Sequence, residues 1–238
     1  MGTLFIVATP IGNLEDITIR ALRALSEADI IACEDTRRTG QLLGSLQRKY
    51  PDLFSGREGK VPPLSYYDQN ETQKIPQIIS LLNEGKNVAL VSDAGTPLIS
   101  DPGFKLVREC IAQGVTVSSI PGPSSLINAL VLAGLPTDKF LFLGYPPRKS
   151  GHRQAFYETI VQSWRAFKTT VVLFEAPHKL AKTLEEMQGT FGDIPVVLLR
   201  EMTKVYEERR EDMISGQLAQ LRKKPPRGEF VLVLPCPF

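Results

Sequence analysis

Short apolar runs alternate with amphipathic segments along this chain. The runs 4–8 and 87–91 have the length and composition of strands buried in a parallel sheet. Between them, residues 17–28 place apolar side chains such as Ala21, Leu22 and Leu25 at helical spacing. This alternation predicts the α/β class with a parallel sheet in the first half of the chain.

The same reading predicts further elements in both halves. In the first half we expect strands at 30–33 and 115–120, and helices at 70–83 and 104–111. In the second half we expect helices at 125–133, 152–167 and 178–188, a helical turn at 218–221, strands at 140–143, 169–174, 196–199 and 230–234, and an edge strand or hairpin at 205–214.

The run Pro121-Gly-Pro-Ser-Ser125 is the predicted junction between two domains. We therefore expect an N-terminal α/β domain at 1–120 and a C-terminal α/β domain with a mixed sheet at 121–238, with a cleft between them. Residues Pro51 to Pro63 carry Gly, Pro and charged side chains, which predicts a mobile surface insertion.

The loop Ser92–Gly103 is the most informative segment. It follows a predicted strand at its carboxyl end, where open α/β sheets bind ligands. Two glycines and two prolines restrict its backbone, so that main-chain groups can approach a ligand closely. Asp101 followed by Pro102 predicts the N-cap and first residue of the next helix. The alternative is a helix entry without a ligand.

Composition narrows the class of protein. The 238 residues are 42% hydrophobic and 23% charged with a formal charge of +2, which is ordinary for a soluble globular protein. No apolar run predicts a membrane span or a signal peptide. Three scattered cysteines indicate reduced thiols in a cytoplasmic protein.

The chain lacks the sequence motifs of several common kinds of binding and catalytic site. The chain has no G-x-G-x-x-G dinucleotide fingerprint, and the segment Gly144–Ser150 lacks the glycine that precedes the lysine of a phosphate loop. The two histidines, His152 and His178, do not stand in a catalytic-triad or metal-ligand motif. We expect no metal centre.

Six ordered motifs resemble one family. The chain resembles the tetrapyrrole-methylase superfamily of S-adenosylmethionine-dependent methyltransferases, and within it is most similar to the ribosomal RNA small-subunit methyltransferase I family. That resemblance covers essentially the whole chain. The motifs are Thr9-Pro-Ile-Gly-Asn-Leu14, Cys33-Glu-Asp-Thr-Arg37, Ser92–Gly103, Pro121-Gly-Pro-Ser124, Phe174-Glu-Ala-Pro-His178 and Gly228-Glu-Phe230.

The resemblance implies a two-domain α/β fold that binds S-adenosylmethionine in the interdomain cleft, usually as a homodimer. It implies 2′-O-methylation of a cytidine in the decoding region of bacterial small-subunit ribosomal RNA, either free or within the small ribosomal subunit. The candidate cofactor-binding residues are Pro10, Ile11, Gly12, Asp93, Ala94, Gly95, Leu98, Ser124, Glu175 and Gly228.

Some of these residues have a plainer interpretation. Asp93 could accept a hydrogen bond from the ammonium or a ribose hydroxyl of the cofactor, or could only cap a turn. Ser124 could contact the ligand or N-cap the helix that follows it. Gly228 could serve only as a strand-entry turn.

Methyl transfer to a ribose hydroxyl benefits from a general base. Glu34 and Asp35 follow a predicted strand at the cleft side and are the candidates, with Arg37 positioned to hold a phosphate. They could equally cap the following helix or pair with Arg37 and Arg38.

Local charge favours an RNA acceptor over a tetrapyrrole, because arginines suit phosphates and base stacking. Two other functions stay open: C-methylation of a tetrapyrrole, and a non-catalytic RNA-binding module. A further basic run, 222–227, is an alternative RNA path. The candidate RNA-binding residues are Arg38, Arg148, Lys149 and Arg153, with Tyr145 nearby as a possible stacking platform.

Overall fold

The computed structural model describes residues 1–54 and 62–237. The chain divides into two compact units, Met1–Ser124 and Ser125–Phe238, which are described separately below. Residues 55–61, the middle of the predicted insertion 51–63, lie outside the described residues. At the two ends of the predicted insertion 51–63 lie a short 3-10 helix, Pro51–Leu53, and the start of a strand at Pro63.

The first unit is built on a five-stranded sheet in the order β3-β2-β4-β1-β5. Every pairing in this sheet is parallel, as the alternation of strands and helices predicted. The parallel arrangement brings the carboxyl ends of all five strands to one edge. The strands are β1 (Thr3–Val7), β2 (Ile30–Cys33), β3 (Pro63–Ser65), β4 (Val88–Val91) and β5 (Thr116–Ile120).

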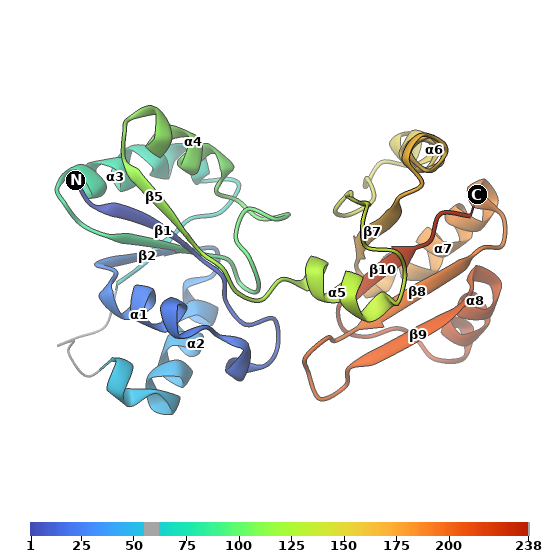
Figure 1. Ribbon diagram of the computed structural model, residues 1–238, viewed down its shortest axis with the longest axis horizontal. Coiled ribbons are helices and arrows are strands. Elements are labelled where there is room, and N and C mark those ends of the chain that lie inside the picture. The colour runs from blue at the N-terminus through green and yellow to red at the C-terminus, as the bar shows by residue number, and fades with distance from the viewer. Residues whose placement is uncertain (55–61, 238) are drawn as a thin grey trace. The chain divides into compact units, whose positions relative to one another are not determined.

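Helices cover both faces of this sheet, with α1 (Ile19–Glu27) and α2 (Thr36–Lys49) on one face and α3 (Glu71–Asn83) and α4 (Phe104–Ala112) on the other (Figure 1). Each face has its own apolar core. All four residues of β4 are buried, because both faces of this central strand are covered.

The start of α4 differs from the sequence prediction. Asp101 and Pro102 were predicted as N-cap and first helical residue, which is wrong: the N-cap is Gly103, and the helix begins at Phe104. Gly103 has a φ of 133°, and a Cβ there would lie 2.8 Å from Cδ2 of Leu90. The close approach of the loop to β4 therefore requires glycine at this position.

The second unit contains a mixed five-stranded sheet in the order β6-β7-β10-β8-β9. Only β6 and β7 run parallel, and the other pairings are antiparallel. The polar strand β9 lies at the edge, which confirms the predicted edge strand. The strands are β6 (Phe140–Phe142), β7 (Thr170–Glu175), β8 (Pro195–Arg200), β9 (Glu208–Met213) and β10 (Phe230–Leu234).

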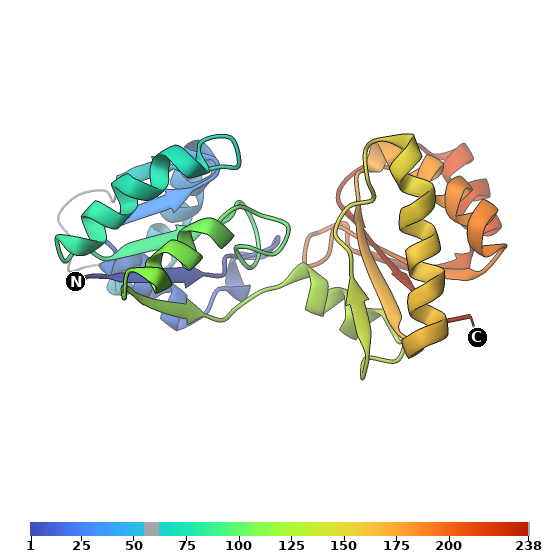
Figure 2. The same cartoon turned by 90° about the horizontal axis from the view of Figure 1, so that it is seen from above.

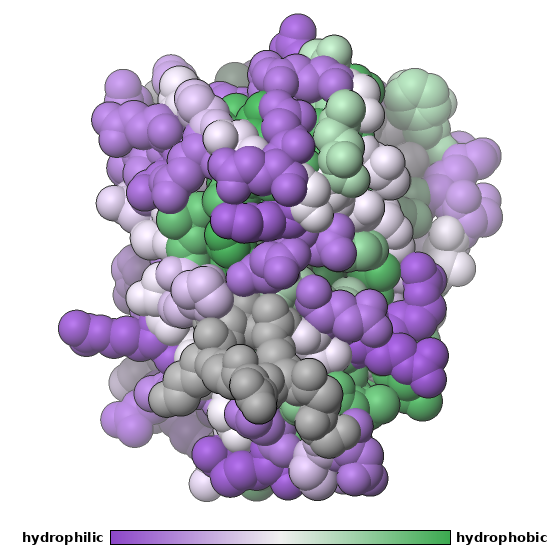
Figure 3. Space-filling view, turned by 90° about the vertical axis from the view of Figure 1, so that its left-hand side faces the viewer, coloured by the Kyte–Doolittle hydropathy of each residue, from purple (hydrophilic) through white to green (hydrophobic). Residues whose placement is uncertain are grey.

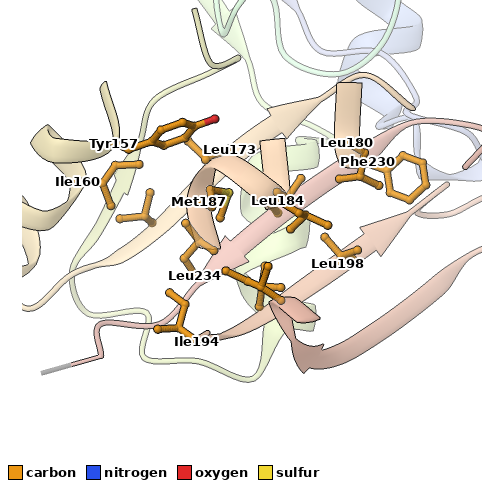
Figure 4. Close-up of a cluster of buried hydrophobic side chains, with 14 of the residues drawn as sticks. Tyr157, Ile160, Leu173, Leu180, Leu184, Met187, Ile194, Leu198, Phe230 and Leu234 are labelled. Carbon is orange, nitrogen blue, oxygen red and sulfur yellow. The ribbon is translucent and has the colours of Figure 1, made fainter. Parts of the chain in front are cut away.

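Three helices cover one face of this sheet and α5 (Ser125–Ala133) packs on the other (Figure 2). The three are α6 (Ser150–Phe167), α7 (Pro177–Phe191) and α8 (Ile214–Lys223). Their apolar side chains meet those of the central strands in one buried cluster (Figure 4). Tyr157 belongs to this cluster, is 1% exposed, and its hydroxyl is hydrogen-bonded to Arg153 and Glu186.

On the face drawn in Figure 3, hydrophilic residues cover most of the surface, and apolar ones show only as scattered patches between them. Within the described ranges, no helix combines the length and the apolar character that crossing a membrane demands.

Candidate active site

Loops at the carboxyl edge of the first sheet are joined to one another. Thr9, after β1, exchanges two backbone hydrogen bonds with Gly95, after β4, with N–O distances of 2.9 and 3.0 Å. The Thr96 hydroxyl donates to the carbonyl of Pro123, after β5, at 3.0 Å. The two segments that the sequence predicted as cofactor loops, 9–14 and 92–103, are thereby brought together.

The loop after β4 holds a strained backbone. Gly95 has a φ of 82°, and a Cβ there would lie 3.2 Å from the Ile11 side chain. Leu98 and Ser100 also have positive φ values, 73° and 65°. Such conformations are costly for residues with a Cβ and cluster at ligand sites. The strain is therefore consistent with a binding loop.

Asp93 has one oxygen available for a ligand. Its Oδ2 accepts a hydrogen bond from Nη1 of Arg38 at 2.8 Å. Its Oδ1 is buried and has no partner among the residues that the structure describes. A buried acceptor without a donor is costly, and an ammonium or hydroxyl group of a ligand would satisfy it. Within this loop Asp93 does not act as the turn cap that was its plainer interpretation.

Glu34 lies in an acidic environment at the end of β2. Burial raises the pKa of its carboxyl to about 7, and the negative charges of Asp101 and Asp93 act in the same direction. Its Oε1 is buried and unpaired within the described part of the chain. The carboxyl group therefore has the protonation range and the open acceptor atom of a general base at neutral pH.

Asp101 is the second carboxyl of this environment with a raised pKa. Burial raises its pKa to about 6, and the charge of Asp93 adds to that effect. A hydrogen bond from Ser92 only partly opposes the change. Asp101 thus belongs to the ligand loop as an acidic group and not to the helix as its cap.

Asp35, next to Glu34, has a different role in the structure. It is the N-cap of α2, and its Oδ1 accepts from the backbone N–H groups of Arg37 at 2.8 Å and Arg38 at 3.2 Å. These hydrogen bonds lower its pKa. The geometry is that of the helix cap that stood as the alternative to catalysis. The Arg37 side chain is exposed beside it.

A buried group that the sequence analysis missed supports the end of the loop. Glu71, at the start of α3, is 5% exposed. Its Oε1 accepts from the Tyr66 hydroxyl at 2.7 Å and from the backbone N–H of Gly103 at 3.1 Å, and its Oε2 pairs with Lys105 at 3.2 Å. Burial alone would raise its pKa, but these three partners lower it overall. Only the tertiary fold reveals this clamp, since Gly103 lies 32 residues after Glu71 in the sequence.

Two predicted cofactor residues of the second unit are engaged in their own unit. Glu175, 3% exposed, accepts from the Thr183 hydroxyl and from the backbone N–H of Ala176. Gly228 has a φ of 94°, and a Cβ there would lie 2.6 Å from the Glu201 side chain. A packing requirement therefore explains Gly228, and internal hydrogen bonds account for Glu175.

The predicted RNA-binding residues differ in their exposure and in their ion pairing. Arg148 and Lys149 are exposed just before α6. Arg153 is not on the surface, which corrects its prediction as an RNA contact: it is 4% exposed, and its guanidinium pairs with Glu186. Arg38 is exposed but paired with Asp93. No residue set in the described ranges of the chain has the make-up of a metal site.

The chain is similar to known proteins over nearly its whole length. The profile of the tetrapyrrole (corrin/porphyrin) methylases matches residues 3–220. The ribosomal RNA small subunit methyltransferase I of Thermotoga maritima is 44% identical over 98% of this chain and 98% of that protein. The protein of the same name from a Hydrogenobaculum species is 46% identical over 97% of this chain and 94% of its own length.

A solved structure supports the fold. The cobalt precorrin-4 methyltransferase of cobalamin biosynthesis is similar over 97% of this chain and 94% of its own, with a TM-score of 0.66 and 18% identity. At that identity the likeness concerns the architecture alone, and it confirms the predicted two-domain α/β fold. The chain belongs to the tetrapyrrole (corrin/porphyrin) methylases and, within them, to the ribosomal RNA small subunit methyltransferase I family.

Proposed function

We propose that this chain uses S-adenosylmethionine to methylate the 2′-hydroxyl of a cytidine in bacterial small-subunit ribosomal RNA. The observation that carries the acceptor class is the near full-length likeness to proteins named ribosomal RNA small subunit methyltransferase I. The carboxyl edge of the first sheet adds the chemical argument, because it combines a strained ligand loop with an unpaired, half-buried carboxyl group.

The residues at that edge fit the cofactor. Asp93 Oδ1 offers an unpaired acceptor for the ammonium or a ribose hydroxyl, and the loops 9–12 and 93–98, joined by the Thr9–Gly95 backbone pair, offer amide and carbonyl groups. When bound, S-adenosylmethionine supplies a methyl group already activated by a sulfonium. We assign Pro10, Ile11, Gly12, Ala94, Gly95 and Leu98 to its binding wall, with Ser124 at the end of the same unit.

Glu34 is the proposed general base. Its Oε1 would take the proton of the ribose 2′-hydroxyl, which becomes a better nucleophile as the proton leaves. A pKa of about 7 leaves a large fraction of the carboxyl ionised at neutral pH while keeping it basic enough to accept that proton. Arg37, exposed on the next helix, is assigned to a backbone phosphate of the acceptor.

RNA is expected to contact exposed cations on each unit. Arg148 and Lys149 are the proposed contacts on the second unit. Arg38 is the proposed contact on the first, although its ion pair with Asp93 would have to loosen. An exposed pair of this kind contributes little stability, so an RNA phosphate can compete for the guanidinium.

The assembly and compartment remain predictions. We expect a cytoplasmic homodimer, as the family resemblance implies. Sedimentation equilibrium of the purified chain tests the dimer directly, since a monomer mass at micromolar concentration would contradict it.

The decisive experiment supplies labelled S-adenosylmethionine and small ribosomal subunits from a strain that lacks the modification. We expect label in the RNA, resistance of the modified linkage to alkaline hydrolysis, and a single cytidine by mapping. Free ribosomal RNA in a parallel reaction separates the two substrate forms. Uroporphyrinogen as the acceptor tests the alternative reaction, and transfer to it with no transfer to RNA would overturn the proposal.

A further inference from the structure

In the segment Tyr145–Lys149, between β6 and α6, the side chains of Tyr145, Arg148 and Lys149 are exposed, whereas Pro146 is buried, and the backbone is fixed. The carbonyl of Gly144 accepts from the N–H of Phe174 at 2.9 Å, and the carbonyl of Lys149 accepts from the N–H of His152 at 3.1 Å. Pro146 and Pro147 restrict the backbone between these points. Surface loops usually keep more freedom than this.

A buried arginine holds the middle of the segment. Nη1 of Arg153 donates to the carbonyl of Pro147 at 3.0 Å. The same guanidinium donates to the Tyr157 and Thr183 hydroxyls, both at 2.8 Å, and forms an ion pair with Glu186. Burying a charge is costly unless its partners satisfy it, and here every nitrogen of the guanidinium has a partner. The arginine is therefore a rigid support beneath the segment.

The support continues into the sheet. The Thr183 hydroxyl, which accepts from Arg153, donates to Glu175 at the end of β7. Glu175 in turn accepts from the N–H of Ala176. The network thus links the segment to α6, α7 and β7, so its geometry is set by the core of the unit.

The exposed side chains above this support match a nucleic acid strand. The Tyr145 ring is 58% exposed and packs edge-on against Phe174, with centroids 5.6 Å apart and an angle of 63° between the ring planes. Arg148 and Lys149 are exposed, and neither forms a salt bridge within the described part of the chain. The nearby carboxylate of Glu186 is engaged by Arg153.

We infer that Tyr145, Arg148 and Lys149 form a preorganised platform for one unpaired stretch of RNA, and that Arg153 is its positioning residue. The exposed face of Tyr145 stacks on a base, and the two cations bind flanking phosphates. A fixed backbone removes most of the ordering cost of binding. The inference rests on the proposed function for the identity of the RNA, but the binding itself can be tested apart from methylation.

The first test is binding of an unstructured, fluorescein-labelled oligoribonucleotide by fluorescence anisotropy across a salt series. Tyr145→Leu should weaken binding about ten-fold, because base stacking on an aromatic ring is lost. Tyr145→Phe is the matched control and should bind within about two-fold of the parent, since it keeps the ring and Phe174 contact. Equal binding by the leucine variant and the parent would overturn the platform.

Charge and support are tested separately. The double variant Arg148→Gln/Lys149→Gln should lower the slope of log affinity against log salt by about 1.4, the value for two phosphates on a single strand.

Pro147→Gly keeps the carbonyl that Arg153 binds but frees the backbone, and should weaken RNA binding several-fold. Arg153→Lys should also weaken RNA binding several-fold, measured at a temperature where circular dichroism shows that this variant is folded. An unchanged affinity in both support variants would refute the positioning role.

Three further measurements separate the possible failures. Calorimetric affinity for S-adenosylmethionine should match the parent in every platform variant. If the parent methylates small subunits and the platform variants do so with unchanged KM, the platform is wrong and the proposed function stands. If the parent binds the oligoribonucleotide through Tyr145 but methylates no ribosomal RNA, the platform stands and the proposed function is wrong. Displacement of the RNA by a poly-glutamate peptide at equal affinity would contradict a nucleic acid partner.

Discussion

Replacing Glu34 by glutamine should remove activity and stabilise the protein above neutral pH. The structure keeps this carboxyl half-buried among other acidic groups, and burial raises its pKa from an ordinary value of 4.5 to about 7. The ionised form is therefore less favourable in the folded than in the unfolded state. Glutamine has nearly the same shape and carries no charge, so it mimics the protonated form.

The sign of the pH dependence follows from this shift. Below pH 4.5 the carboxyl is protonated in both states and costs nothing. As the pH rises from 4.5 to 7 the unfolded chain loses its proton first, so the parent loses stability relative to the glutamine variant. Above pH 7 the difference is constant. One pKa unit corresponds to about 1.4 kcal/mol, which sets a ceiling of about 3 kcal/mol. Partial solvent exposure reduces the expected gain to about 1–2 kcal/mol.

Calorimetric melting at pH 4.5 and pH 8 measures this difference. For a chain of this size, that gain corresponds to a rise in Tm of about 2–8 °C at pH 8 for the transition of the first unit. At pH 4.5 the two proteins should melt within about 2 °C of each other. Asp35→Asn is the matched control, because asparagine keeps the helix cap and Asp35 has a lowered pKa.

The activity assay is single-turnover methylation as a function of pH. The parental rate should rise through about pH 7 and then level off, as expected for a base with that pKa. Glu34→Gln should lower the rate at least a hundred-fold and abolish this dependence. A variant with parental rates, or one less stable than the parent at pH 8, would refute the assignment of Glu34 as a buried base.

Three shorter predictions concern the supports of the site. Asp35→Ala should lower Tm by a few degrees through loss of the cap of α2, and reduce the methylation rate less than Glu34→Gln does, as melting and single-turnover assays will show. Gly95→Val should abolish calorimetric binding of S-adenosylmethionine, because a β-branched residue at a φ of 82° collides with Ile11. Glu71→Gln should weaken cofactor binding about ten-fold with kcat little changed, since its charge-assisted bond to the Gly103 N–H is weakened. Unchanged affinity would exclude Glu71 from loop positioning.

Strong apolar runs made much of the fold predictable from the sequence. The strands 30–33 and 230–234 and the helix 125–133 have the predicted bounds, because each is an apolar segment with polar or Gly/Pro residues at its ends. The short strand β3 and the bounds of α2 were missed. In α2 only Thr39 and Leu46 are buried, and two glycines interrupt it, so the helical pattern is weak.

The burial and the roles of several site residues depend on tertiary contacts that local sequence patterns do not show. Arg153 has the same local context as Arg148 and Lys149, a basic cluster after a strand, yet only Arg153 is buried. Its burial depends on Glu186, which is contributed by another helix. Likewise, Asp101 has the local pattern of a helix cap, but the positive φ of Gly103 starts α4 two residues later. Patterns within a few residues cannot encode such contacts.

The adjacent carboxyl groups of Glu34 and Asp35 illustrate the same point in chemical terms. Both were candidates for the base, and at the level of sequence they are interchangeable. The backbone N–H groups at the start of α2 lower the pKa of Asp35, whereas burial and the charge of Asp101 raise that of Glu34. Opposite environments separate acid–base roles between neighbouring groups. Asp35 can therefore stay ionised and cap the helix, whereas Glu34, the residue before that cap, can exchange a proton near neutral pH.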